Sequence, residues 1–79
     1  MSGQQIDHLV KMANQIALNF GERRNLSEAA HKTAEHLKKF WTPDMRQQLA
    51  TYAEEDGEAL SPAVSLLLQE QRGENRNTP

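Results

Sequence analysis

Three side chains near the middle of the chain, His31, Glu35 and His36, are of types that bind divalent metal ions. His31 and Glu35 are four residues apart, so on a helix they share a face, one turn apart. His36 falls on another side of such a helix, and the His-Glu-x-x-His spacing of zinc proteases is missing. Because a zinc site needs three or four ligands, the pattern favours a solvated His–Glu pair over a metal centre.

Carboxylates and hydroxyls are the other candidates for chemistry. The acidic run EEDGE, residues 54–58, could form a contact patch. Acid–base catalysis, however, needs carboxylates held in different environments across a cleft, so we expect a solvated helix end. Ser27 and Ser61 stand before helical segments, where serine caps backbone N–H groups, so we expect caps instead of nucleophiles.

The composition removes several classes of enzyme. The chain has no cysteine and its four glycines are scattered, which excludes thiol catalysis, iron–sulfur clusters and a glycine-rich phosphate loop. We therefore predict no catalytic residue, no bound cofactor and no metal site. The absence of cysteine also fits, weakly, a reducing compartment, and we expect a cytoplasmic protein.

Size and charge point toward binding. A chain of 79 residues buries too little surface for high stability, and without disulfides a partner is the expected aid. The net charge of −2 gives no general attraction to nucleic acid, which depends on phosphate neutralisation. No segment resembles a signal peptide or reaches the length of a membrane span. The isolated chain could also form a homodimer.

The elements that position these residues are predicted to be helices. Apolar residues three and four apart predict a helix over residues 6–20, stopped by Gly21. Ser27 is expected to cap a second helix that runs to Phe40, with Leu26 before the cap as a hydrophobic staple. A third helix is expected from Pro43 to Asp56-Gly57.

A fourth, short helix is expected from Ser61-Pro62, with Val64, Leu67 and Leu68 inward. The expected fold class is all-α: a small bundle of three to four short helices. Residues 1–72 would form one domain, followed by a polar tail over residues 73–79 that we expect to be disordered.

The segment KKFWTPDMR, residues 38–46, holds the only tryptophan. Pro43 disfavours helical geometry at the residue before it, so one helix must end here and another begin. Phe40 and Trp41, if adjacent on a helix, point about 100° apart, so one should seal the core and the other be partly available. Core packing of both rings and docking of one on a partner are the two alternatives. The candidate partner interface consists of Phe40, Trp41, Met45, Arg46, Lys38 and Lys39.

Three segments together resemble a known family: HLVKMANQIALNF (residues 8–20), AEHLKKFWTPDMRQQL (residues 34–49) and LSPAV (residues 60–64). They are similar to the delta subunit of the bacterial NAD-dependent, molybdenum-containing formate dehydrogenase. The most specific part is the corner formed by His36, Leu37, Phe40, Trp41, Pro43, Met45 and Arg46.

The resemblance implies a short, helical, cytoplasmic accessory subunit that is not itself an enzyme. It implies binding to the larger subunits, which carry the molybdenum site, the iron–sulfur clusters and the flavin, for assembly, maturation or stability. The alternative is a free-standing small helical protein that is regulatory or binds DNA. For DNA binding, residues 26–41 would form a helix-turn-helix, but the short glycine-centred turn of that motif is missing.

Overall fold

The chain folds into four α-helices in a computed structural model that describes residues 2–76, with side chains described over residues 5–73. The helices are α1 (Ser2–Asn19), α2 (Leu26–Phe40), α3 (Pro43–Glu55) and α4 (Pro62–Arg76). This confirms the predicted all-α fold. None of the described helices is long and apolar enough to cross a lipid bilayer.

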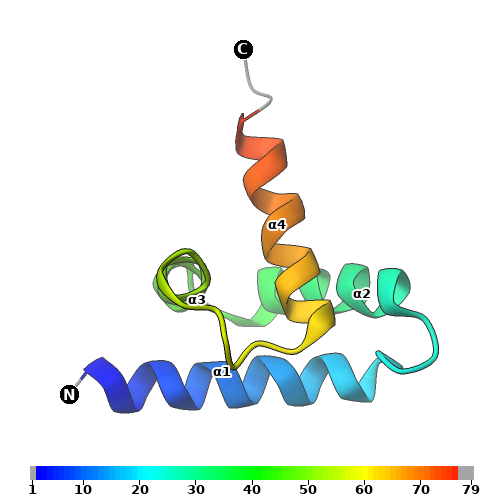
Figure 1. The fold of residues 1–79 in the computed structure, drawn as a ribbon, viewed down its shortest axis with the longest axis horizontal. Coiled ribbons are helices and arrows are strands. Elements are labelled where there is room, and N and C mark those ends of the chain that lie inside the picture. The colour runs from blue at the N-terminus through cyan, green and yellow to red at the C-terminus, as the bar shows by residue number, and fades with distance from the viewer. Residues whose placement is uncertain (1, 77–79) are drawn as a thin grey trace.

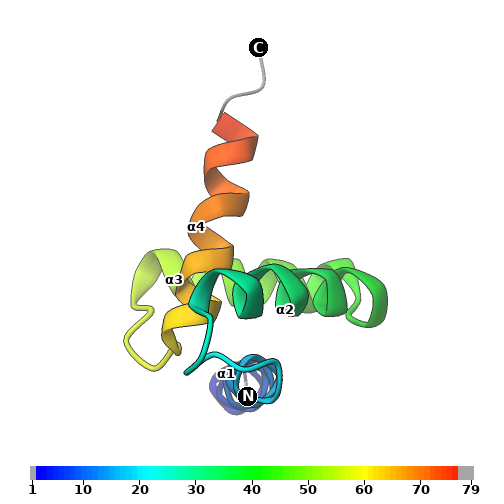
Figure 2. The same cartoon turned by 90° about the vertical axis from the view of Figure 1, so that its right-hand side faces the viewer.

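The helices form a base with one upright element. α1 runs along the base with α2 and α3 above it, and α4 stands away from them (Figure 1). α3 is seen end-on in Figure 1 and α1 end-on in Figure 2, so these two helices run crosswise. α4 makes its widest contact with α2.

The core lies where the four helices meet. Alanines at the facing positions of α1 and α2 let these two helices approach closely, and leucine and valine from α4 fill the space above them. The apolar face predicted for α4 is confirmed, because Val64, Leu67 and Leu68 are all buried. The buried apolar residues are Leu9, Val10, Ala13, Ala17, Ala29, Ala30, Leu37, Trp41, Leu49, Ala63, Val64, Leu67 and Leu68.

Two glycines end helices as the sequence predicts. Gly21 has φ +85° and donates its N–H to the Leu18 carbonyl at 3.1 Å, while Glu22 donates to the Ala17 carbonyl at 3.2 Å. These are the two bonds of a Schellman motif, which needs a left-handed residue at this position. Gly57, with φ +69°, follows the end of α3.

The start of α2 differs from the prediction. Asn25, and not Ser27, is the N-cap: its side-chain oxygen accepts the N–H of Glu28 at 3.0 Å. Ser27 is an exposed residue inside the first turn, and Leu26 is the first helical residue instead of a staple before the cap. Asn and Ser cap almost equally well, and here Asn25 comes first along the chain.

The start of α3 is as predicted. Thr42 has an extended backbone, and its hydroxyl oxygen accepts the N–H of Met45 at 3.2 Å. Pro43 occupies the first helical position, where its missing N–H has no partner to lose.

The start of α4 is capped from elsewhere in the chain. The Ser61 hydroxyl, which we expected to cap this helix, is buried without a hydrogen-bond partner. Instead a carboxylate oxygen of Glu22, in the α1–α2 loop, accepts the N–H of Ala63 at 2.8 Å. An acidic group suits this position because the N-terminal end of a helix carries partial positive charge.

Asn14 ties the connection between α3 and α4 to α1. Its side-chain nitrogen donates to the Ala59 carbonyl at 2.9 Å, and its side-chain oxygen accepts the N–H of Ser61 at 2.9 Å. The Tyr52 hydroxyl also accepts the N–H of Ala59, at 3.1 Å. The second half of this short connection is therefore held in place before α4 begins.

α4 continues through Gly73 to Arg76, into the segment predicted as a disordered tail. Residues 77–79 of that segment lie outside the described residues.

We predict that Asn14→Ala lowers the free energy of unfolding by about 1–2 kcal/mol, because it removes two hydrogen bonds and leaves a partly buried N–H unpaired. Urea unfolding followed by circular dichroism measures the change. The matched control is Gln15→Ala, which removes an exposed amide from the next position of α1 and should change stability by less than ~0.5 kcal/mol. Equal losses in the two variants would contradict a specific role for Asn14.

Candidate functional site

The two adjacent aromatic residues of the predicted interface have opposite environments. Trp41 is 6% exposed and belongs to the core, whereas Phe40 is 71% exposed. The expectation that one ring seals the core while the other is available is confirmed. In this conformation Trp41 offers little surface to a partner, and Phe40 offers most of its ring.

The backbone explains the separation, and it does so differently from our expectation. α2 ends at Phe40, and Trp41 is its C-cap with φ −97° and ψ 146°, which is an extended conformation. The two residues are therefore not consecutive on one helix. The change of backbone conformation at Trp41 accompanies the burial of its indole. Pro43 disfavours helical geometry at Thr42, the residue directly before it, so α2 has to end within this segment.

Phe40 is part of an aromatic patch that also includes His36 and Phe20. The centroids of the His36 and Phe40 rings are 4.7 Å apart, and the two ring planes make an angle of 44°. The centroids of the Phe20 and His36 rings are 6.1 Å apart, with an angle of 64° between the planes. His36 and Phe40 are four residues apart on α2, while Phe20 comes from the end of α1. The imidazole thus links two phenyl rings from different elements.

The sequence analysis missed Phe20 and His36 as site residues. Phe20 is the last of the apolar residues whose spacing predicted the first helix, yet α1 ends at Asn19 and Phe20 is 36% exposed. The spacing of His36 and Phe40 was a usable signal, since residues four apart on a helix are neighbours.

The aromatic patch borders a shallow hollow lined by Phe20, Lys32, Glu35, His36, Lys39 and Phe40. Two lysines and one glutamate are among the lining residues, so the hollow has a net charge of +1. We call Lys32 and Lys39 the lysine rim.

Lys38 and Arg46, the other charged residues of the predicted interface, lie on a different face. Both line a hollow between α2 and α4, together with His31, Glu35 and Glu70 among others. The Arg46 Nε atom is buried and has no hydrogen-bond partner. Met45 is half-buried against the core. The predicted set is therefore divided among two separate hollows and the core.

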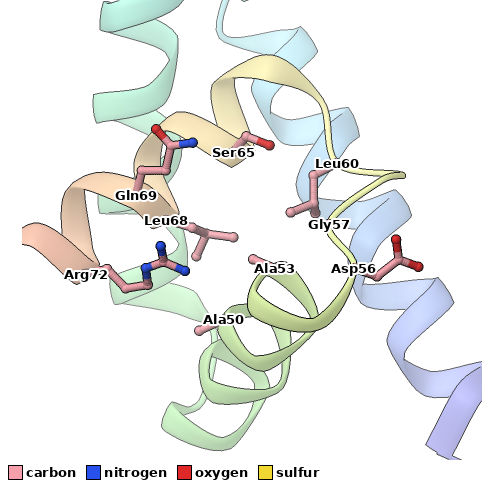
Figure 3. A pocket seen from close by; sticks show the side chains of 9 residues that line it. All are labelled: Ala50, Ala53, Asp56, Gly57, Leu60, Ser65, Leu68, Gln69 and Arg72. Atoms are coloured by element: carbon pink, nitrogen blue, oxygen red, sulfur yellow. The ribbon is translucent and has the colours of Figure 1, made fainter.

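A third hollow lies between α3 and α4. Figure 3 shows Leu68 pointing into it and Asp56 pointing away, and most of its remaining lining is small or polar. Arg72 lies 3.9 Å from a Glu54 carboxylate oxygen, but both side chains are at least half exposed, so this ion pair contributes little. The lining residues are Ala50, Ala53, Asp56, Gly57, Leu60, Ser65, Leu68, Gln69 and Arg72.

The side chains considered for chemistry do not converge. His31 Nε2 lies 3.5 Å from a Glu35 carboxylate oxygen and both side chains are exposed, which confirms the predicted solvated pair. His36 belongs to the aromatic patch instead. Among the residues whose side chains are described, no three His, Asp or Glu are grouped so that they could hold a metal ion.

The acidic run at the end of α3 is an exposed helix end, as expected. Glu54, Glu55, Asp56 and Glu58 are all exposed. A carboxylate oxygen of Asp56 accepts the N–H of Glu58 at 3.3 Å, so this group takes part in the turn that follows α3.

Comparison with known proteins gives one family. The model of the family described as NADH-dependent formate dehydrogenase delta subunit FdsD matches residues 8–66, from α1 into α4. The match confirms the predicted resemblance and includes the aromatic corner. No curated protein and no solved structure is similar enough to the chain to count as a match.

We predict that Trp41→Ala destabilises the protein by about 3–5 kcal/mol, because it leaves a large cavity in a small core. Phe40→Ala, the adjacent control, should change the free energy of unfolding by less than ~0.5 kcal/mol, because that ring is mostly in solvent. Urea unfolding of the two variants tests the pair. A stable Trp41→Ala protein would contradict the assignment of Trp41 to the core.

Proposed function

The chain belongs to the family of NADH-dependent formate dehydrogenase delta subunits, and we propose that it is a non-catalytic accessory subunit that binds the larger subunits of such an enzyme. The proposal rests first on the family match, which covers residues 8–66 and so includes parts of all four helices.

The non-catalytic role is supported by the places of the side chains that could react. His31 and Glu35 form an exposed pair, and His36 packs between phenyl rings. Glu22 caps α4, and the Ser61 hydroxyl is buried beneath the start of that helix. Catalysis by a nucleophile needs a base within hydrogen-bond reach, and Ser61 Oγ has no such partner.

A binding role is supported by the surface of the protein. The surface presents exposed aromatic side chains, a residue type that is enriched in protein interfaces, and charged side chains lie beside them, as in the polar rim of an interface. The basic residues near the corner are divided between two faces of α2, and the whole chain carries a net charge of −2. This arrangement favours a protein partner over a nucleic acid, which would need a continuous basic surface.

The accessory role that follows is assembly, maturation or stabilisation of the larger subunits. We propose that these subunits carry the molybdenum chemistry and that the complex is cytoplasmic. In this proposal the chain contributes a folded binding surface, and formate oxidation takes place entirely on its partners.

We predict that the larger subunits of the same organism's formate dehydrogenase give less active complex when they are expressed without this chain. Formate-dependent NAD reduction per milligram and size-exclusion chromatography measure activity and assembly. A tagged copy of the chain should co-purify with the larger subunits, and the chain alone should show no formate oxidation.

Two results would refute the proposal. One is an unchanged yield and activity without the chain, together with no co-purification. The other is formate oxidation by the purified chain alone.

A further inference from the structure

We propose that the aromatic patch of Phe20, His36 and Phe40, with its lysine rim, is the surface that docks on a larger formate dehydrogenase subunit. The complementary site on that subunit would be an apolar pocket that receives the Phe40 ring and has carboxylates at its edge. This inference rests on the proposed function and adds to it the face of the molecule that makes the contact.

The exposed apolar surface is concentrated here. Four large apolar side chains are exposed among the described residues: Leu18, Phe20, Leu26 and Phe40. Two of them belong to the aromatic patch, where His36 connects their rings. Phe40 is the most exposed of the four at 71%. Aromatic anchors that fill a partner's pocket supply most of the affinity of typical interfaces.

The patch is also preorganised. Phe40 is the last residue of α2 and is followed by the buried Trp41, and the centroid of its ring lies 4.7 Å from that of His36. These neighbours restrict the ring before a partner arrives. Less side-chain freedom is then lost on docking, which favours binding.

Charge favours a partner over a second copy of the chain. The charged lining consists of Lys32, Lys39 and Glu35, and Glu35 also pairs with His31. In a two-fold dimer through this patch, the lysine rims of the two copies would be brought to the same interface. Like charges there oppose association, whereas carboxylates on a different protein would attract it and set its orientation.

Three other hollows lined by described residues lack this combination. One of them has neither an apolar side chain nor a lysine, and is lined by Asn25, Ser27, Glu28, His31 and Glu70. The hollow between α2 and α4 mixes Lys38 and Arg46 with Glu35 and Glu70, and no exposed large apolar residue lines it. The hollow between α3 and α4 is lined mostly by small and polar residues. The hollow at the aromatic patch joins the exposed Phe20 and Phe40 rings to charged lining residues with a net charge of +1, and the three others compared with it among the described residues do not.

The test measures binding of the full chain to a complex of the larger subunits prepared without it, by biolayer interferometry. Phe40→Ala should weaken binding about 10–100-fold, as loss of a central aromatic anchor does. Lys39→Glu should weaken binding about tenfold and reduce its dependence on salt, because it reverses one charge of the lysine rim.

Two matched controls separate this face from the rest of the surface. Lys38→Glu makes the same charge change one residue away, on the hollow between α2 and α4. Leu18→Ala removes an exposed apolar side chain that does not line the hollow at the patch. Both should bind within about threefold of wild type. Circular dichroism and thermal unfolding of every variant confirm that the fold is retained.

The outcomes separate the inference from the proposed function. If the wild-type chain binds and Phe40→Ala binds equally well, the docking surface is elsewhere, although the accessory role stands. Equal weakening by Lys38→Glu and Lys39→Glu would also overturn the assignment of this face. So would a homodimer of the isolated chain that Phe40→Ala disrupts while binding to the larger subunits is unchanged. If the wild-type chain does not bind at all, the proposed function fails and the inference fails with it.

Discussion

The position of α4 depends on a few hydrogen bonds from α1 and from the loop that follows it. Asn14 uses both its donor and its acceptor on the connection between α3 and α4, and Glu22 accepts the first N–H that α4 can offer, that of Ala63. Pro62 has no N–H, and the Ser61 hydroxyl makes no hydrogen bond, so this cap has no local substitute. In a small domain with little apolar surface, such polar contacts decide which of several compact arrangements is adopted.

Fixing α4 determines the rest of the surface. α4 stands on the base formed by the other helices, with its buried face against α2 (Figure 2). One side of α2 is therefore used for the core, and Lys38 lines the hollow beside α4. The side nearest the end of α1 is left to Phe40 and Lys39. Lys38 therefore belongs to one surface, and Lys39 and Phe40 to another, although the three residues are consecutive in the sequence.

Local signals in the sequence were sufficient for the helices and insufficient for their connections. Apolar spacing predicted the inward faces of α1 and α4, and Thr42-Pro43 predicted the start of α3, because these depend on residues within one or two turns. The cap of α4 could not be predicted, since Glu22 and Ala63 are 41 residues apart. The N-cap of α2 was misplaced because Asn25 and Ser27 are equally good caps by local chemistry. Of the aromatic patch, the sequence could indicate only the pair of His36 and Phe40, which are four residues apart on one helix. Phe20 comes from the end of another helix and joins them only in the folded structure.

Pro43 links stability to the proposed docking surface. It disfavours helical geometry at Thr42, so α2 has to end before that residue. The helix ends at Phe40 and Trp41 is its extended C-cap, with the Trp41 ring in the core and the Phe40 ring in solvent. A partner that holds Phe40 therefore also holds the turn of backbone that keeps Trp41 buried. Because a ligand that binds only the folded chain stabilises it by mass action, association at this corner would add stability that so small a core lacks. If the proposed docking holds, association would therefore contribute to the stability of the fold itself.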